Sequence, residues 1–270
     1  ATLLFAKRFS RSRFLGWIKA FQPSIIIAVP TVVNLLLESP PDDAATAFDG
    51  VRFVSCSTAP LMPEQHRRFE NTYGVRLVQL YGMSEGGVVC ANYPETRRIG
   101  SVGRPGLYHT ITIRDPEGRA LPPGEVGEIE TVSAQHAQAY LHADGTLEPI
   151  RGGGLKSGDI GYLDENGFLI VTGRARDVII RGGVNIAPLE IDAILTTHAA
   201  VAEAATFGIP DPVYGEEVAS WVTVMPGHTL TPEDLATHCA AHLPEAKCPK
   251  HIEIVDEIPK NDRGKIDRNA

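Results

Sequence analysis

The sequence lacks several features that would each assign it to a particular class of protein. Its longest apolar run, residues 25–30, is far shorter than the roughly 20 residues that span a bilayer. The N-terminus has no signal-peptide layout. Four cysteines are present, at 56, 90, 239 and 248, and none forms a C-x-x-C pair. We therefore expect reduced thiols and a cytoplasmic protein without a membrane span.

A basic excess is also lacking, because 33 acidic residues outnumber 25 Lys and Arg and give a net charge of −8. This balance argues against a nucleic-acid or membrane-surface binder. The cations do gather near the C-terminus, where a local site for a small anionic ligand is expected. They are Lys247, Lys250, Lys260, Arg263, Lys265 and Arg268.

The composition present is that of a soluble globular protein, with 43% hydrophobic and 21% charged residues. At roughly 150 residues per domain, the 270 residues predict about two domains. The sequence does not begin with Met, so we expect it to be part of a longer chain.

Strands and helices alternate in the first third of the sequence. A buried strand is predicted at residues 25–29 and further strands at 51–57 and 75–80. Helices are predicted at 9–21, 32–37 and 63–73. Gly74 is expected to end the last of these helices. Such alternation is typical of a parallel sheet flanked by helices, the α/β class.

The pattern changes twice after Gly100. Short strands separated by Gly- and Pro-rich turns are predicted at 111–114, 127–132 and within 158–172, which indicates a mostly antiparallel β subdomain. From Asp177, strands alternate with helices that begin at Pro188 and after Thr231, which indicates a small α+β unit. We predict a boundary at 174–177, and hence domains 1–176 and 177–270.

Two isolated motifs favour other functions only weakly. Residues 82–86 match G-x-S-x-G, the nucleophile elbow of hydrolases, but the residues that follow are a poor helix start. His238, Cys239 and His242 have the spacing of metal ligands on one helix face, yet no further ligand stands at a suitable spacing. We interpret the second group as ordinary helix surface.

Four segments taken together carry more information. They are YGMSE at 81–85, SGDIGY at 157–162, GRARD at 173–177 leading into IRGGVNIAP at 180–188, and PKNDRGKIDR at 259–268. Their order and spacing resemble the adenylate-forming superfamily, in its acyl-CoA synthetase branch, over essentially the whole chain. By this resemblance, 1–176 is the later part of the large AMP-binding domain and 177–270 is the mobile C-terminal domain.

The resemblance implies a function for each motif residue, and the residue types suit these functions. Tyr81, with Gly82 and Ser84, would contact adenine and phosphate, and Glu85 would bind Mg²⁺ as a hard oxygen ligand. Asp159 would accept hydrogen bonds from the ribose hydroxyls, because a carboxylate only accepts. Arg174 would bind ribose or phosphate through its planar guanidinium.

The C-terminal domain would contribute the remaining site residues. By the resemblance, Lys265 would be the catalytic cation that contacts the substrate carboxylate and the α-phosphate. Glu85 would also take part in catalysis, because it would bind the Mg²⁺ ion. Gly182 and Gly183 would line the path of the pantetheine arm of coenzyme A, where glycine allows close approach.

The implied reaction is the joining of a carboxylic acid to AMP from ATP, followed by displacement of AMP by CoA. The family's Ser/Thr/Gly-rich phosphate loop, which ends in Lys-Gly, is absent from these residues. We therefore expect the 270 residues alone to be inactive, and exposed apolar surface to favour homo-oligomers. Two alternatives stay open: an adenylation domain that loads a carrier-protein thiol, or a nucleotide- or partner-binding chain without activity.

Overall fold

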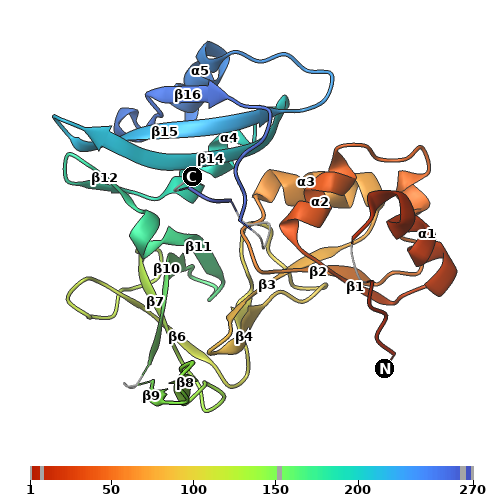
Figure 1. The fold of residues 1–270 in the computed structure, drawn as a ribbon, viewed down its shortest axis with the longest axis horizontal. Coiled ribbons are helices and arrows are strands. Elements are labelled where there is room, and N and C mark those ends of the chain that lie inside the picture. The colour runs from red at the N-terminus through yellow and green to blue at the C-terminus, as the bar shows by residue number, and fades with distance from the viewer. Residues whose placement is uncertain (1, 7–8, 151–153, 262–265, 269–270) are drawn as a thin grey trace.

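The structure is a computed structural model that describes residues 2–6, 9–150, 154–261 and 266–268. The described residues form three main sheets, which Figure 1 shows as separate layers along the chain. Within these ranges no helix is both long and apolar enough to cross a membrane.

The first sheet has the strand order β1-β2-β3-β4-β5. Its strands are β1 (Ile25–Ala28), β2 (Phe53–Cys56), β3 (Leu77–Met83), β4 (Gly87–Ala91) and β5 (Arg104–Pro105). β1, β2 and β3 run parallel, as the α/β pattern predicts, and β4 and β5 return antiparallel. The associated helices are α1 (Arg11–Phe21), α2 (Pro30–Leu37) and α3 (Pro63–Tyr73), with the short 3₁₀ helix η1 (Ala44–Thr46). We call these elements the N-terminal layer.

Local sequence explains where α3 begins and ends. Pro63 occupies the first turn, where a missing N–H costs nothing. Gly74 ends the helix with φ of 63°, a left-handed conformation that glycine adopts readily. The Tyr73 hydroxyl then donates to the Leu36 backbone oxygen at 2.7 Å and ties α3 to α2.

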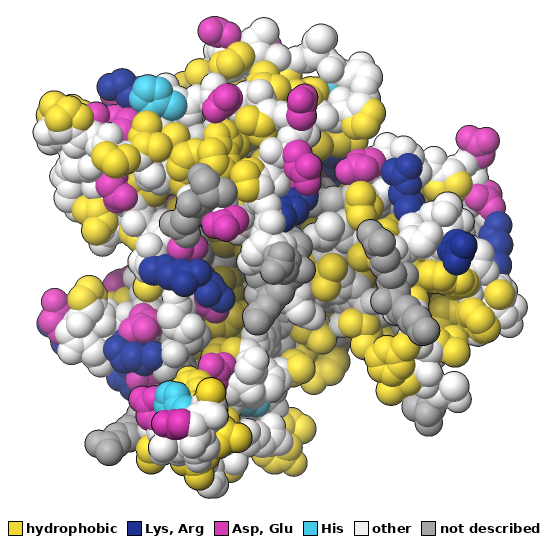
Figure 2. Space-filling view, in the orientation of Figure 1, with side chains coloured by type: hydrophobic (Ala, Val, Ile, Leu, Met, Phe, Trp, Pro, Cys, Tyr) yellow, Lys and Arg dark blue, Asp and Glu magenta, His cyan; other side chains and the backbone are white. Residues whose placement is uncertain are grey.

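The strand β1 corrects one expectation. A buried strand was predicted here, but Ile25 is 44% exposed and Ile27 is 75% exposed, while Ile26 and Ala28 are buried. The reason is that β1 is an edge strand whose buried side chains face the helices. Figure 2 shows hydrophobic side chains gathered on the surface at the end of the molecule formed by α1 and β1.

The second sheet is antiparallel, with the order β11-β10-β7-β6. Its strands are β6 (Thr110–Arg114), β7 (Gly127–Val132), β10 (Leu155–Leu163) and β11 (Leu169–Arg174), and a separate pair is β8 (Ala139–Leu141) with β9 (Leu147–Pro149). The β10–β11 hairpin turns between Asp164 and Gly167, where the Gly167 N–H donates to the Asp164 backbone oxygen at 2.9 Å. This sheet agrees with the expected β-rich subdomain.

The third sheet and two helices follow the 3₁₀ turn η2 (Ala175–Asp177). The sheet contains β12 (Ile179–Arg181), β13 (Val184–Ile186), β14 (Val201–Asp211), β15 (Gly215–Val224) and β16 (His251–Ile254). The helical elements are α4 (Pro188–Leu195), α5 (Pro232–His242) and the 3₁₀ turn η3 (Glu245–Lys247). Thr231 and Asp234 form a capping box at the start of α5. Described residues from 177 onward are called the C-terminal unit below.

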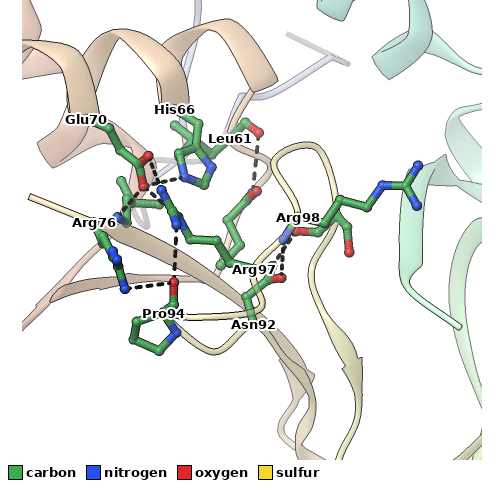
Figure 3. Close-up of polar contacts among 11 residues, drawn as sticks. Leu61, His66, Glu70, Arg76, Asn92, Pro94, Arg97 and Arg98 are labelled. Carbon is green, nitrogen blue, oxygen red and sulfur yellow. Dashed lines mark hydrogen bonds and ion pairs between the residues drawn. The ribbon is translucent and has the colours of Figure 1, made fainter. Parts of the chain in front are cut away.

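A partly buried carboxylate, that of Glu70, anchors α3 to the chain beyond β4 (Figure 3). Glu70 accepts hydrogen bonds from Arg97 Nε at 2.9 Å and from the Leu77 backbone N–H at 2.7 Å. His66 Nε2 lies 3.2 Å from the same carboxylate. Burial opposes ionisation, but these partners outweigh it and lower the pKa of Glu70 to about 2.

The C-terminal cations that the structure describes are paired with carboxylates, and the expectation of a local site for a small anion stays a prediction. Each of the four within the described ranges lies against a carboxylate: Lys247 with Glu190, Lys250 with Glu217, Lys260 with Glu203 and Arg268 with Asp192. Arg263 lies outside the described residues.

The cysteines behave as predicted. Cys56, Cys90 and Cys239 are buried free thiols, and Cys248 is partly buried. Burial raises the pKa of both Cys56 and Cys90 to about 12.

Candidate functional site

Three of the predicted site residues meet around one carboxylate. The Tyr81 hydroxyl, at the end of β3, donates to Asp159 Oδ2 at 2.8 Å. Arg174 Nε, at the end of β11, lies 3.2 Å from Asp159 Oδ1. The two contacts engage different oxygens of Asp159, so the carboxylate is held between the first and second sheets.

Strand register explains part of this arrangement. Asp159 and Arg174 are direct cross-strand partners in the β10–β11 hairpin. The Ser157 hydroxyl accepts a hydrogen bond from the Asp159 backbone N–H at 3.1 Å and itself donates to the Ile129 oxygen of β7 at 2.9 Å. Ser157 thus holds the Asp159 backbone in place, a function that the sequence analysis did not assign to it.

The electrostatics of the trio are complementary. Burial and the neighbouring Asp159 charge raise the pKa of Tyr81 well above its usual range, so the phenol stays protonated and donates. The Arg174 side chain is half exposed, whereas that of Asp159 is largely buried. The carboxylate has about four acceptor positions, so acceptor capacity remains beyond the two observed contacts.

Gly82 lies near the end of β3, and Ser84 and Glu85 lie in the tight connection between β3 and β4. A Cβ on Gly82 would lie 2.1 Å from the Gly87 backbone oxygen, so only glycine fits here. Ser84 is exposed in the turn. The chain continues as a strand and not as a helix, so the match to G-x-S-x-G lacks the strand–turn–helix context of a hydrolase nucleophile.

Glu85 meets the chemical needs of a magnesium ligand. Its carboxylate is partly exposed and accepts a hydrogen bond from the Tyr140 hydroxyl of β8 at 3.2 Å, while its backbone oxygen accepts from Ala137. Within the described ranges no cluster of three or more ligating side chains is found. A single carboxylate still fits Mg²⁺, which commonly uses one or two carboxylates together with phosphates and waters. No sequence pattern pointed to Tyr140.

The predicted glycine pair forms the turn of the β12–β13 hairpin in the C-terminal unit. Gly182 has φ of 56° and Gly183 has φ of 84°, as a two-residue turn of this kind requires at both positions. The Gly182 N–H donates to the Tyr214 oxygen at 2.8 Å. Turn geometry alone therefore accounts for both glycines.

Lys265, the predicted catalytic lysine, lies outside the described residues. Its described neighbours on either side are placed: Lys260 and Ile266 form a β-bridge, and the Asp267 N–H donates to the Pro259 oxygen at 2.9 Å.

A pair of histidines packs behind the turn that carries Glu85, and sequence reasoning missed it. The rings of His109 and His136 lie 5.7 Å apart between centroids. A Cβ on Gly86 would lie 3.6 Å from His136 Cδ2, so His136 packs directly against this turn. Burial and His109 lower the pKa of His136, which favours the neutral ring.

Comparison with known proteins places the chain in one family. A family model described as AMP-binding enzyme matches residues 1–141, and one described as AMP-binding enzyme C-terminal domain matches 190–265. The sulfoacetate–CoA ligase of Cupriavidus necator is 38% identical over 97% of this chain and 52% of its own length. The oxalate–CoA ligase of Arabidopsis thaliana is 32% identical over 99% of this chain and 53% of its own. The chain thus spans about half the length of these relatives.

Solved structures agree with the sequence relatives. The amide bond synthetase McbA from Marinactinospora thermotolerans has a TM-score of 0.88 and 31% identity, covering 97% of this chain and 55% of that one. ATP-bound MatB from Rhodopseudomonas palustris has a TM-score of 0.87 and apo MatB 0.78, at 27% and 28% identity, over 98% of this chain and 53% of theirs. The TM-score is thus higher against the ATP-bound form of that protein than against its apo form.

Proposed function

Because the chain belongs to the AMP-binding enzyme family, we propose that the protein containing it is an ATP-dependent carboxylic acid–CoA ligase. The observation that best supports this proposal is the contact of Tyr81 and Arg174 with Asp159, which joins three of the predicted nucleotide-binding residues in space. The CoA ligases among the relatives support CoA as the acceptor.

In the first step, a carboxylate oxygen of the acid attacks the α-phosphorus of ATP and pyrophosphate leaves. Asp159 would accept hydrogen bonds from the ribose, while Tyr81, with Gly82 and Ser84, would border adenine and the α-phosphate. Arg174 keeps Asp159 oriented and adds positive charge beside the nucleotide. Lys265 would stabilise the negative charge that develops between the acid and the α-phosphate.

Magnesium would be held by Glu85 together with phosphate oxygens, and it would neutralise phosphate charge. Tyr140 would orient the Glu85 carboxylate through its hydroxyl.

In the second step, the thiol of CoA attacks the acyl carbonyl, loses its proton and displaces AMP. The Gly182-Gly183 turn would border the pantetheine arm. We propose residues 1–176 and 177–270 as the two domains that carry these steps, with Lys265 serving the first and the glycine turn the second. A cytoplasmic location agrees with the free thiols.

The proposal is tested on the native full-length protein that contains these residues. Lys265→Ala should greatly slow pyrophosphate release, yet largely spare thioester formation from supplied acyl-AMP, because charge develops at the α-phosphate only in the first step. Lys250→Ala is the matched control, since Lys250 pairs with Glu217 elsewhere in the C-terminal unit.

Acceptor identity needs its own measurement. Product formation with CoA, but not with a purified carrier protein, is expected. Transfer to the carrier alone would show that the protein is a carrier-loading adenylation domain and not a CoA ligase. If the wild type performs neither half-reaction, the protein is a binding protein without this activity.

A further inference from the structure

Three histidines from two helical regions meet in the C-terminal unit. His238 and His242 belong to α5, and His198 follows the end of α4. The ring of His238 lies 5.4 Å from that of His198 and 4.6 Å from that of His242, measured between centroids. His198 and His238 are partly buried, and His242 is exposed. The fold thus adds a third histidine to the pair that the sequence spacing singled out.

Cys239, the remaining member of that sequence pattern, is not part of this group. Its side chain is fully buried in the core of the C-terminal unit, together with Leu235 and Leu243. His238 and His242 are four positions apart, so they lie on one face of α5 in successive turns. Two imidazoles at this spacing can bind one metal ion, as they do in zinc-binding helices with the H-E-x-x-H pattern.

Hydrogen bonds determine which ring nitrogen of His238 is available to a ligand. Its Nε2 lies 3.1 Å from the Ile194 backbone oxygen and 2.8 Å from Thr197 Oγ1. A carbonyl oxygen only accepts, so Nε2 carries the proton and Nδ1 keeps its lone pair. The Thr197 hydroxyl donates to the same Ile194 oxygen at 2.7 Å, so its oxygen accepts from the imidazole. Burial lowers the pKa of His238, which also favours the neutral ring.

His242 is held in the same way, with the two ring nitrogens exchanged. Its Nδ1 donates to the His238 backbone oxygen at 2.8 Å, so its Nε2 keeps the lone pair. Each of the two rings therefore donates one N–H to a backbone carbonyl and has a lone pair on the other nitrogen. Metal-binding histidines have this arrangement, because the N–H contact fixes the ring and makes the ligating nitrogen more basic.

The helix ends around the two rings favour a cation. His242 is the last residue of α5, and His238 contacts the Ile194 oxygen in the last turn of α4. The C-terminal end of a helix carries a partial negative charge, because its last carbonyls have no helical partners. The ring of His198 stands nearly perpendicular to that of His238, at 87°, so packing restrains the His238 ring.

We propose that His238 and His242 form a binding site for a divalent transition-metal ion such as Cu²⁺, Ni²⁺ or Zn²⁺, with water completing the coordination. Imidazole suits these ions, whereas Mg²⁺ prefers oxygen ligands. The described ranges hold no group of three or more ligating side chains, so the site has two protein ligands. It is separate from Glu85 and does not depend on the proposed function. A bound ion would link two turns of α5 and, through His238, brace them against α4.

Copper binding by the native full-length protein tests this proposal, with Cu²⁺ alone as the probe. Of the three ions, Cu²⁺ binds nitrogen ligands most tightly. Its EPR spectrum reports how many imidazole nitrogens coordinate it. We expect two in the wild type and one in His242→Gln. The affinity of that variant should fall at least roughly 10- to 100-fold, the loss that a mutated outer-shell partner already causes at metal sites.

His228→Gln is the matched control, because His228 is an exposed histidine of the same unit. Its copper affinity and EPR spectrum should remain those of the wild type. Thr197→Val leaves both ligands in place but removes one acceptor of the His238 N–H, so it should weaken copper binding roughly tenfold. Both His242 and Thr197 are exposed, so these variants should fold.

The melting temperature gives a second readout. An ion that binds only the folded protein raises its stability as the ion concentration rises above the dissociation constant. Ni²⁺ should therefore raise the melting temperature of the wild type and of His228→Gln, and much less that of His242→Gln. The inference is overturned if copper on the wild type shows no imidazole nitrogen, if excess Mg²⁺ displaces it, or if His242→Gln and His228→Gln bind copper equally.

Discussion

The Tyr81 hydroxyl donates a hydrogen bond to Asp159 across 2.8 Å, although 78 residues separate the two in the chain. This bond ties the end of a strand in the first sheet to a central strand of the second. It keeps one carboxylate oxygen directed at Tyr81 while Arg174 holds the other. The geometry of the proposed ribose site thus depends on a long-range contact.

Removing this hydroxyl should weaken nucleotide binding modestly. Tyr81→Phe leaves the ring but removes the donor, so we expect a roughly five- to tenfold rise in the KM for ATP, the equivalent of about 1 kcal/mol for one hydrogen bond. Steady-state kinetics on the full-length protein would measure it. Tyr73→Phe is the matched control, because its buried hydroxyl bonds Leu36 instead and should affect stability but not the KM.

Substitution at the glycine turn should separate the two half-reactions in the opposite sense to Lys265. A Cβ at Gly183 meets open space, with no described atom within 4 Å, so Gly183→Leu adds bulk where we place the pantetheine arm. Pyrophosphate release should persist while thioester formation drops.

Backbone strain at Gly183 requires a control, because its φ is 84°. Gly183→Asn tolerates such a φ and adds less apolar bulk. It should retain more thioester formation than the Leu variant. An equal loss of both half-reactions in the Leu variant would mean that the turn is purely structural.

Glu70 should make stability depend on pH in the acid range. Its folded pKa, about 2, lies below the ordinary value of 4.5. The contribution is therefore fully present above pH 4.5 and is lost as pH falls towards 2. At pH 7, Glu70→Gln should lower the free energy of unfolding by about 3 kcal/mol, with the difference from wild type shrinking below pH 4.5.

Urea unfolding at pH 7 and pH 3 would measure this effect. Glu117→Gln is the control, since Glu117 is well exposed beside Arg119 and an exposed pair contributes little. A constant Glu70→Gln difference across this pH range would contradict the assignment of the shift to His66, Arg97 and the Leu77 N–H.

A protein consisting of these 270 residues alone should release pyrophosphate several orders of magnitude more slowly than the full-length protein. The reason is that the β- and γ-phosphates would lack a loop of backbone N–H groups to hold them. A pyrophosphate assay with a panel of carboxylic acids and ATP tests this directly. Light scattering should show oligomers, because Ile27, Phe21 and their neighbours expose apolar surface. Equal turnover by the two proteins would show that the site is complete without such a loop.

Local sequence signals predicted the helices and strands well, but they did not predict which residues far apart in the chain are paired. Pro63 and Gly74 mark both ends of α3, because each has a conformational preference that acts within one turn. The half-exposed β1 could not be predicted from its apolar run, since burial there depends on which faces other elements cover. Arg268 looked like a member of a cationic patch, but its partner Asp192 lies 76 positions away and only folding brings them together.

The buried cysteines have a consequence for the second half-reaction. CoA brings a free thiol into the protein, and disulfide exchange requires a thiolate on one partner and access for the other. Cys56 and Cys90 have pKa values of about 12 and Cys239 of about 11, so thiolate is scarce at neutral pH, and all three are shielded by packing. If the protein uses CoA as proposed, these three thiols are therefore poor partners for disulfide exchange with CoA or with oxidised CoA disulfide.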